Sequence, residues 1–225
     1  VVTDWGGSND HVEGVREGST LEMPAPGGDS VRELLAAVES GKISESDIDA
    51  RLSELLPLVF DTKAALDAAP REFDAAAHHA LARRAAEESL VLLKNEGGVL
   101  PIDLGRAKTI AVVGENAIKM MTVGGGSSSL KVRHEYTPLE GIRAAAAGKA
   151  EVIYERGYVG DVTGDYNGVK TGQDLSESRS EEQLIADAVA AARKADAVIF
   201  VGGLNKSRHQ DSEQVDRLEY GLPYG

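Results

Sequence analysis

Short apolar runs alternate with helix-like segments through the second half of the chain, and this alternation restricts the fold more than any other feature. The strand-sized runs and the helical patterns follow one another at residues 91–93, 109–113, 139–147, 151–154, 181–195 and 197–201. Strands that alternate with helices favour a mostly parallel sheet with helices on its faces. We therefore predict an α/β fold for this part of the chain.

Helices are also predicted before the alternating segments. Residues 72–90 are Ala-rich and predict a long helix that opens a second domain. Asp29 or Ser30 is placed to cap a helix over residues 31–38, and a further helix is expected to start at Ser44 and to end near Pro57. Little periodicity follows it, which suits a linker. The predicted division is residues 1–60, a linker at 61–71, and a second domain at 72–225.

The chain opens on Val1-Val2-Thr3, which predicts the end of a buried strand that runs into a turn at Gly6 and Gly7. It does not begin with methionine, and after Gly221 it stops without a closing helix. These ends lead us to expect a fragment of a longer protein. Targeting and compartment therefore stay open.

Composition excludes several classes of protein. Of the 225 residues, 42% are hydrophobic, which is enough for a core, and the longest apolar runs are too short to cross a membrane. The formal net charge of −13 disfavours nucleic acid and anionic membranes as partners. The chain has no Cys, which excludes disulfides, thiolate metal sites and a cysteine nucleophile.

The first candidate site residue is Asp4, with Trp5 beside it. Asp4 comes at the carboxyl end of an apolar strand, where barrels and open α/β sheets hold their reacting groups, and Trp5 could stack on a sugar ring. The alternative is that Asp4 caps the next turn and that Trp5 belongs to the core.

The second candidate is Glu213, in an acidic segment that follows the apolar run at 197–201. This segment could equally be a solvated surface loop. Two carboxylates from separate domains would suit glycoside hydrolysis, in which one attacks the sugar and the other protonates the leaving oxygen. Sequence spacing does not show whether Asp4 and Glu213 meet.

A glycine-rich run at residues 124–129 raises the possibility of a phosphate site. It matches no phosphate-binding motif, and a loop that lines a cleft with backbone amides explains it at least as well. The five His residues are scattered, and His78 and His79 have no partner at metal-ligand spacing, so we expect no metal and no cofactor.

Several motifs together resemble glycoside hydrolase family 3. They occur in the family's order over nearly the whole chain. They are Thr3-Asp4-Trp5-Gly6, Leu21-Glu22-Met23-Pro24, Ser89-Leu90-Val91-Leu92-Leu93-Lys94-Asn95, Val113-Gly114-Glu115-Asn116-Ala117, Gly124-Gly125-Gly126-Ser127, Thr137-Pro138-Leu139-Glu140-Gly141 and Ser212-Glu213 with Asp216-Arg217.

The resemblance implies the C-terminal tail of a (β/α)8-type barrel followed by an α/β sandwich with a mostly parallel sheet. It implies a retaining, exo-acting β-glucosidase that removes terminal β-D-glucosyl residues through a covalent glycosyl-enzyme intermediate. Asp4 would be the nucleophile, Glu213 the acid/base and Trp5 a flank of the bound sugar. Gln214 follows Glu213 where the family usually has glycine, and the family's other sugar-binding groups lie upstream of the nucleophile.

Other functions remain open at this stage. A β-xylosidase or an α-L-arabinofuranosidase of the same family is the nearest alternative, and a non-catalytic α/β module that binds through the glycine-rich run is the alternative from another class. The expected partner is a β-glucoside or oligosaccharide substrate. Linkage preference and oligomeric state are not determined, and a homo-oligomer stays among the options.

Overall fold

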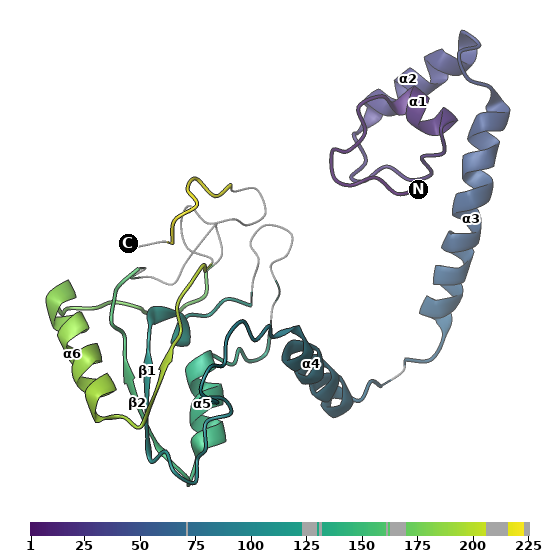
Figure 1. The fold of residues 1–225 in the computed structure, drawn as a ribbon. Coiled ribbons are helices and arrows are strands. Elements are labelled where there is room, and N and C mark those ends of the chain that lie inside the picture. Colours follow the sequence, from purple (N-terminus) through teal and green to yellow (C-terminus); the bar gives the residue numbers. More distant parts are fainter. Residues whose placement is uncertain are drawn as a thin grey trace. The chain divides into compact units, whose positions relative to one another are not determined.

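The computed structural model describes residues 1–70, 72–122, 130, 132–160, 162, 170–205 and 216–222. Contacts divide the chain into two compact units, Val1–Leu90 and Val91–Gly225. Figure 1 shows the helices of the first unit and the sheet of the second. The division falls after the helix that we expected to open the second domain.

The first unit contains four helices among its described residues. They are α1 (His11–Arg16), α2 (Gly28–Glu39), α3 (Glu45–Asp67) and α4 (Ala75–Ser89). A small core forms where Val12 of α1, Ala37 of α2 and Ile43 pack together. The opening strand is reduced to a single parallel bridge between Val2 and Leu21.

Three expectations for this unit were wrong in detail. Helix α1 was not among the predicted helices; it forms because the Asp10 side chain caps it and Val12 is buried. Helix α2 starts after Gly27 without a side-chain cap, so neither Asp29 nor Ser30 caps it.

Helix α3 also differs from its prediction. It begins at the predicted place, where Ser44 and Asp47 form a capping box, but it passes through Pro57 and continues to Asp67. A proline removes one backbone hydrogen bond of a helix without having to end it. An ion pair between Lys63 and Asp67 joins the last turns. Most of the predicted linker is therefore helical.

The described residues of the second unit form a three-stranded parallel sheet in the order β2–β1–β3. The strands are β1 (Thr109–Val113), β2 (Glu151–Glu155) and β3 (Ala197–Phe200), and the helices are η1 (Glu115–Ala117), α5 (Pro138–Ala146) and α6 (Glu181–Lys194). Each of these strands, as well as α5 and α6, lies within a residue or two of its predicted position. The mixed α/β prediction for this part of the chain is confirmed.

The central strand holds the core. Ile110 and Val112 of β1 are buried against Leu139 and Ala146 of α5. Figure 1 shows α5 and α6 on opposite sides of the sheet, which explains why β1 is apolar on both faces. Thr137 and Glu140 form a capping box that starts α5, with Pro138 in its first turn.

The apolar run at residues 91–93 is not a strand. Its three side chains, Val91, Leu92 and Leu93, are exposed, and the backbone of this run has no strand partner in the described residues. A strand needs a neighbour to satisfy its backbone groups, so an apolar run alone does not produce one.

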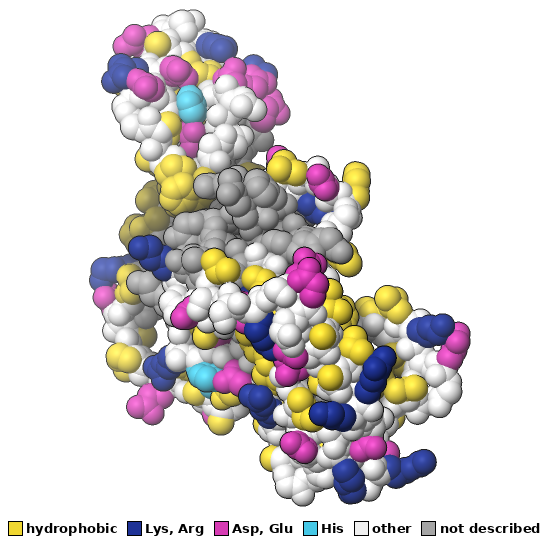
Figure 2. Space-filling view, turned by 90° about the vertical axis from the view of Figure 1, so that its left-hand side faces the viewer, with side chains coloured by type: hydrophobic (Ala, Val, Ile, Leu, Met, Phe, Trp, Pro, Cys, Tyr) yellow, Lys and Arg dark blue, Asp and Glu magenta, His cyan; other side chains and the backbone are white. Residues whose placement is uncertain are grey.

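Charged side chains are mixed over the visible surface. On the face in Figure 2, Lys and Arg side chains are interspersed with Asp and Glu side chains. Nucleic-acid binding usually relies on basic side chains clustered on one face or along one helix. The face in Figure 2 offers no such cluster.

Gly114 is a position in the described part of the second unit where only glycine fits. Its φ is +120°, and a Cβ there would lie 2.3 Å from the carbonyl oxygen of Val201. We expect Gly114→Ala to lower the free energy of unfolding of this unit by about 3 kcal/mol or more, through backbone overlap and strain. Urea unfolding followed by circular dichroism measures it.

Gly148→Ala is the matched control for this prediction. Gly148 also has a positive φ, of +71°, but no atom lies within 4 Å of the added Cβ. Only the conformational cost remains there, about 1–2 kcal/mol. Equal losses at the two positions would contradict the predicted contact with Val201.

Candidate active site

Asp4 lies in a tight turn at the end of the paired segment. The backbone N–H of Trp5 donates to Asp4 Oδ1 at 2.8 Å, and the N–H of Gly7 donates to the Asp4 carbonyl oxygen at 2.9 Å. Gly6 supplies the positive φ, of +72°, that the turn needs. The carboxylate is exposed, and a local backbone donor holds one of its oxygens.

Trp5 is also exposed, with 71% of its surface accessible. It is therefore not a core residue of the described first unit, contrary to one of the two interpretations of its position. A flat, exposed aromatic side chain beside a carboxylate is suited to stacking on a sugar ring.

The remaining predicted site residues are not described. Glu213 and the glycine-rich run at 124–129 lie outside the described residues. Of the predicted site, the structure thus places only Asp4 and Trp5, which are neighbours in the turn. The roles of all three site residues stay predictions.

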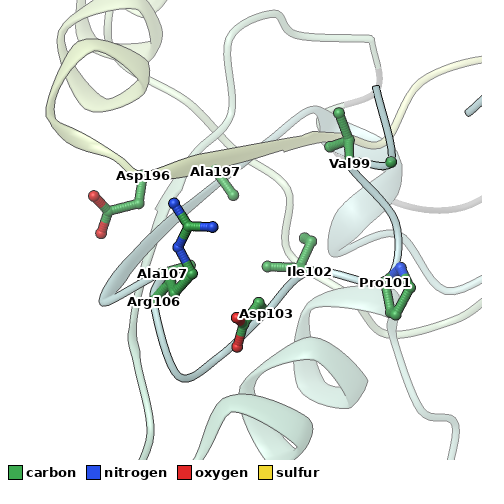
Figure 3. A pocket seen from close by; sticks show the side chains of 9 residues that line it. Val99, Pro101, Ile102, Asp103, Arg106, Ala107, Asp196 and Ala197 are labelled. Carbon is green, nitrogen blue, oxygen red and sulfur yellow. The ribbon is translucent and has the colours of Figure 1, made fainter. Parts of the chain in front are cut away.

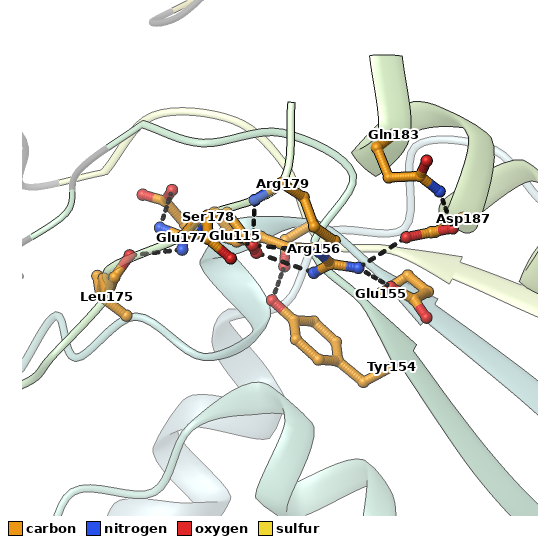
Figure 4. A network of polar contacts seen from close by, with 11 residues as sticks. Glu115, Tyr154, Glu155, Arg156, Leu175, Glu177, Ser178, Arg179, Gln183 and Asp187 are labelled. Atoms are coloured by element: carbon orange, nitrogen blue, oxygen red, sulfur yellow. Dashed lines mark hydrogen bonds and ion pairs between the residues drawn. The ribbon is translucent and has the colours of Figure 1, made fainter. Parts of the chain in front are cut away.

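A buried charged cluster follows the carboxyl ends of β1 and β2. Glu115 is fully buried, and its Oε2 accepts from Arg156 Nη2 at 2.9 Å and from the backbone N–H of Gly160 at 2.5 Å. Lys119, also buried, places its Nζ 3.9 Å from Glu115 Oε1. Arg156 donates in addition to the carbonyl oxygen of Leu175 at 2.5 Å (Figure 4).

Two buried amides join the segments that follow β1 and β3. Asn205 Nδ2 donates to Asn116 Oδ1 at 2.8 Å, and Asn116 Nδ2 donates to the carbonyl oxygen of Gly203 at 3.2 Å. Ligands of open α/β sheets bind at the carboxyl ends of the strands. The charged cluster and this amide pair therefore connect the segments at the carboxyl edge of the sheet, where a ligand is expected.

Arg179 forms a second, more exposed cluster near this edge. It donates to Glu155, Glu177 and Asp187, each at 2.9 Å (Figure 4). The hydrogen bonds from Arg179 lower the pKa of Glu177 to about 2. Burial raises the pKa of the nearby Tyr154, whose hydroxyl donates to the Gly114 carbonyl oxygen at 3.3 Å.

A pocket of about 400 Å³ lies at the opposite end of the sheet. Its lining includes Asp103, Arg106 and Asp196, and Figure 3 shows the Arg106 side chain extending toward the segment that begins β3. This is the amino-terminal end of the strands, where ligands of open α/β sheets do not usually bind. We therefore place the candidate site elsewhere.

Asp196 ties β1 to β3 at that end. Its Oδ2 accepts from the backbone N–H groups of Lys108 at 2.8 Å and Thr109 at 3.0 Å, and these bonds lower its pKa from the ordinary 3.8. A carboxyl group with a lowered pKa in the folded state stabilises the fold above its unfolded pKa and loses that effect as the pH falls through the folded pKa.

We expect Asp196→Asn to reduce the acid sensitivity of the second unit. The urea midpoint of the parent should fall as the pH drops below about 4, and it should fall less steeply in the variant. Measuring the midpoint between about pH 6 and pH 2 tests this. Parallel pH curves for parent and variant would contradict it.

The described residues contain neither a candidate metal-binding cluster nor a helix that could cross a membrane. No group of three or more His, Asp or Glu side chains in those ranges is arranged to hold a metal ion. No described helix is both long enough and apolar enough to span a membrane.

The sheet and its carboxyl edge correspond to a known domain. The family model of the glycosyl hydrolase family 3 C-terminal domain matches residues 90–225. The chain belongs to glycosyl hydrolase family 3. The resemblance drawn from the sequence motifs is thereby confirmed.

Curated relatives in the family include glycosidases of two specificities. A thermostable β-glucosidase B of Acetivibrio thermocellus is 35% identical over 225 residues, which is 99% of this chain and 27% of that protein. An exo-α-(1→6)-L-arabinopyranosidase of Bifidobacterium breve is 30% identical over 230 residues, which is 99% of this chain and 28% of that protein. The chain thus spans less than a third of the length of either relative.

Solved structures of the family agree with this fold. The crystal structure of a family 3 β-glucosidase from Bifidobacterium adolescentis matches 99% of this chain and 29% of its own, with a TM-score of 0.76 at 30% identity. A β-glucosidase from Kluyveromyces marxianus in complex with glucose matches 71% of this chain and 20% of its own, with a TM-score of 0.58 at 25% identity.

The buried polar residues behind the carboxyl edge of this family 3 chain were not predicted from the sequence. Glu115 and Arg156 each come just after an apolar strand, which is a signal that they sit at its carboxyl end. Nothing in the sequence indicates that they pair, because 41 positions separate them. Likewise, only the parallel pairing of β1 with β3 brings Asn116 and Asn205 close together.

Proposed function

We propose that this chain is part of a retaining, exo-acting β-glucosidase. The observation that carries the proposal is family 3 membership together with Asp4, an exposed carboxylate held in a turn beside the exposed Trp5. The β-glucosidases among the relatives support glucose as the sugar that is removed. The substrate is a β-glucoside or an oligosaccharide that ends in β-glucose.

The proposed mechanism uses two carboxyl groups. Asp4 attacks the anomeric carbon while Glu213 donates a proton to the leaving oxygen, which gives a covalent glycosyl-enzyme. Glu213 then removes a proton from water, and the water displaces Asp4 with net retention. For this outcome the two carboxyl groups should lie about 5 Å apart.

The domain proposal follows from these roles. Residues 1–60 contain the end of a (β/α)8-type barrel and supply Asp4, while residues 72–225 supply Glu213 from an α/β sandwich. The parallel pairing of Val2 with Leu21 supports a barrel-like strand at the start.

The test of the proposed function also covers a second sugar specificity. The relative from Bifidobacterium breve is an arabinopyranosidase, and it is nearly as similar to this chain as the β-glucosidases are. Hydrolysis of a panel of nitrophenyl glycosides by the complete gene product separates the two. The panel contains β-glucoside, β-xyloside, α-L-arabinofuranoside and α-L-arabinopyranoside, and β-glucoside is expected to be cleaved fastest.

The acid/base role of Glu213 gives a further prediction. Glu213→Ala should slow hydrolysis by about 10²–10⁴-fold for leaving groups that need a proton and much less for dinitrophenolate, which leaves without one. Added azide should restore turnover and give the β-glycosyl azide, because it attacks the glycosyl-enzyme in place of water. A uniform loss over all leaving groups would assign the acid to another residue.

A further inference from the structure

The segment before Asp4 pairs with the segment that begins at Leu21 through a single parallel bridge. The N–H of Leu21 donates to the Val1 carbonyl oxygen at 3.1 Å, and the N–H of Thr3 donates to the Leu21 carbonyl oxygen at 3.0 Å. These two bonds form one parallel bridge, centred on Val2 and Leu21.

The same pattern continued would pair the next residues. The N–H of Met23 would donate to the Thr3 carbonyl oxygen, and the N–H of Trp5 would donate to the Met23 carbonyl oxygen. In that pairing the Trp5 N–H would donate to Met23 and no longer to the Asp4 carboxylate.

Side chains replace both of these backbone hydrogen bonds. Met23 N–H donates to the hydroxyl of Thr3 at 2.9 Å, and this hydroxyl lies 3.4 Å from the Met23 carbonyl oxygen. Trp5 N–H donates to Asp4 Oδ1 at 2.8 Å. The Thr3 hydroxyl therefore bonds to the Met23 backbone groups at the point where the strand pairing ends.

We propose that Thr3 is a positioning residue for Asp4. By accepting from Met23, its hydroxyl ends the strand pairing and leaves the Trp5 N–H to hold Asp4 Oδ1, which orients the carboxylate for attack. This inference rests on the proposed function, because it assigns Thr3 a role only if Asp4 is the nucleophile.

The orientation matters because attack needs alignment. The attacking oxygen must approach the anomeric carbon opposite the leaving group, and small misplacements of a reacting group cost up to about 10²-fold in rate. Asp4 is exposed, so packing does not restrict its side chain. The bond from Trp5 is then what limits its rotation.

The attack step can be measured alone with a trapping substrate. We choose a dinitrophenyl glycoside whose hydroxyl next to the anomeric carbon is replaced by fluorine. A bond forms between Asp4 and the anomeric carbon, the bond to the dinitrophenyl oxygen breaks, and dinitrophenolate leaves with the electron pair. The fluorine slows the later attack by water, so that the glycosyl-enzyme accumulates and intact mass spectrometry counts it.

Thr3→Val removes the hydroxyl and keeps the shape of the side chain. We expect the rate constant of labelling in the complete gene product to fall about ten-fold or more, while the labelled fraction at the end stays that of the parent. Thr3→Ser restores the hydroxyl and should label within about three-fold of the parent rate. If Thr3→Val only impaired folding, the final labelled fraction would fall instead of the rate constant of labelling. Thr3→Ser would then not restore a faster rate constant.

Thr62→Val is the matched control. Thr62 lies in α3, and its hydroxyl also bonds to backbone, donating to the Leu58 carbonyl oxygen at 2.8 Å. Its loss should leave the rate constant of labelling unchanged. The inference is overturned if Thr3→Val labels at the parent rate, or if Thr3→Ser is as slow as Thr3→Val.

The failure of this inference can be told apart from the failure of the proposed function. If the parent is not labelled, or if peptide mapping finds the label on a residue other than Asp4, the proposed function fails and the role of Thr3 falls with it. If Asp4 carries the label and Thr3→Val is as fast as the parent, only the inference about Thr3 fails.

Discussion

Asp4→Ala should lower kcat/KM of the complete gene product by at least about 10³-fold on every glycoside that the parent cleaves. Without the carboxylate no glycosyl-enzyme forms, and the loss of a covalent nucleophile affects all substrates of the enzyme. Asp4 makes no ion pair in the described residues and only local hydrogen bonds, so the fold should tolerate the change.

Azide distinguishes loss of the nucleophile from loss of structure. Azide can enter the space left by the Asp4 side chain and attack the anomeric carbon, which gives a glycosyl azide of inverted configuration. Asp29→Asn is the control, because Asp29 is an exposed acid of α2 whose contact is a surface ion pair with Arg32. Near-parental turnover in Asp4→Ala would refute the assignment of Asp4.

Glu115→Gln should destabilise the second unit by about 3–5 kcal/mol. The substitution removes the buried negative charge that faces Arg156 and Lys119, and breaking a buried ion pair from one side leaves its partner's desolvation uncompensated. Glutamine keeps the size of the side chain, so packing contributes little. Urea unfolding followed by circular dichroism gives the change in the free energy of unfolding.

Glu96→Gln makes the same substitution at an exposed pair of the same unit. Glu96 Oε2 lies 3.2 Å from Lys94 Nζ, and both side chains are largely exposed. The expected change in the free energy of unfolding is within about 1 kcal/mol. If Glu115→Gln also stays within about 1 kcal/mol, the buried cluster does not stabilise the sheet. A double-mutant cycle with Arg156→Met then measures the coupling between Glu115 and Arg156.

The regular elements of the second unit could be predicted because each carries its signal locally. β1 is a continuous apolar run, as expected of a central parallel strand, and α5 starts at a Thr137-Glu140 capping box. The run at residues 91–93 carries the same apolar signal and is not a strand. Pairing depends on a neighbour, and apolar character alone does not supply one.

Local signals were weaker in the first unit. α1 has only six residues and includes Gly14, so its propensity is low, and burial of Val12 against Ala37 is what stabilises it. The extension of α3 beyond Pro57 was missed for the opposite reason, since proline is a strong but not absolute signal for the end of a helix.

The sequence by itself determined the α/β class, the family and the turn that presents Asp4 and Trp5, because each is indicated by short motifs whose own residues are close together along the chain. Only the tertiary structure decided how Thr3 meets Met23 and how Glu115 meets Arg156. These contacts join residues that are 20 and 41 positions apart. They form because parallel strands bring distant segments into register, and spacing along the chain contains no record of that register.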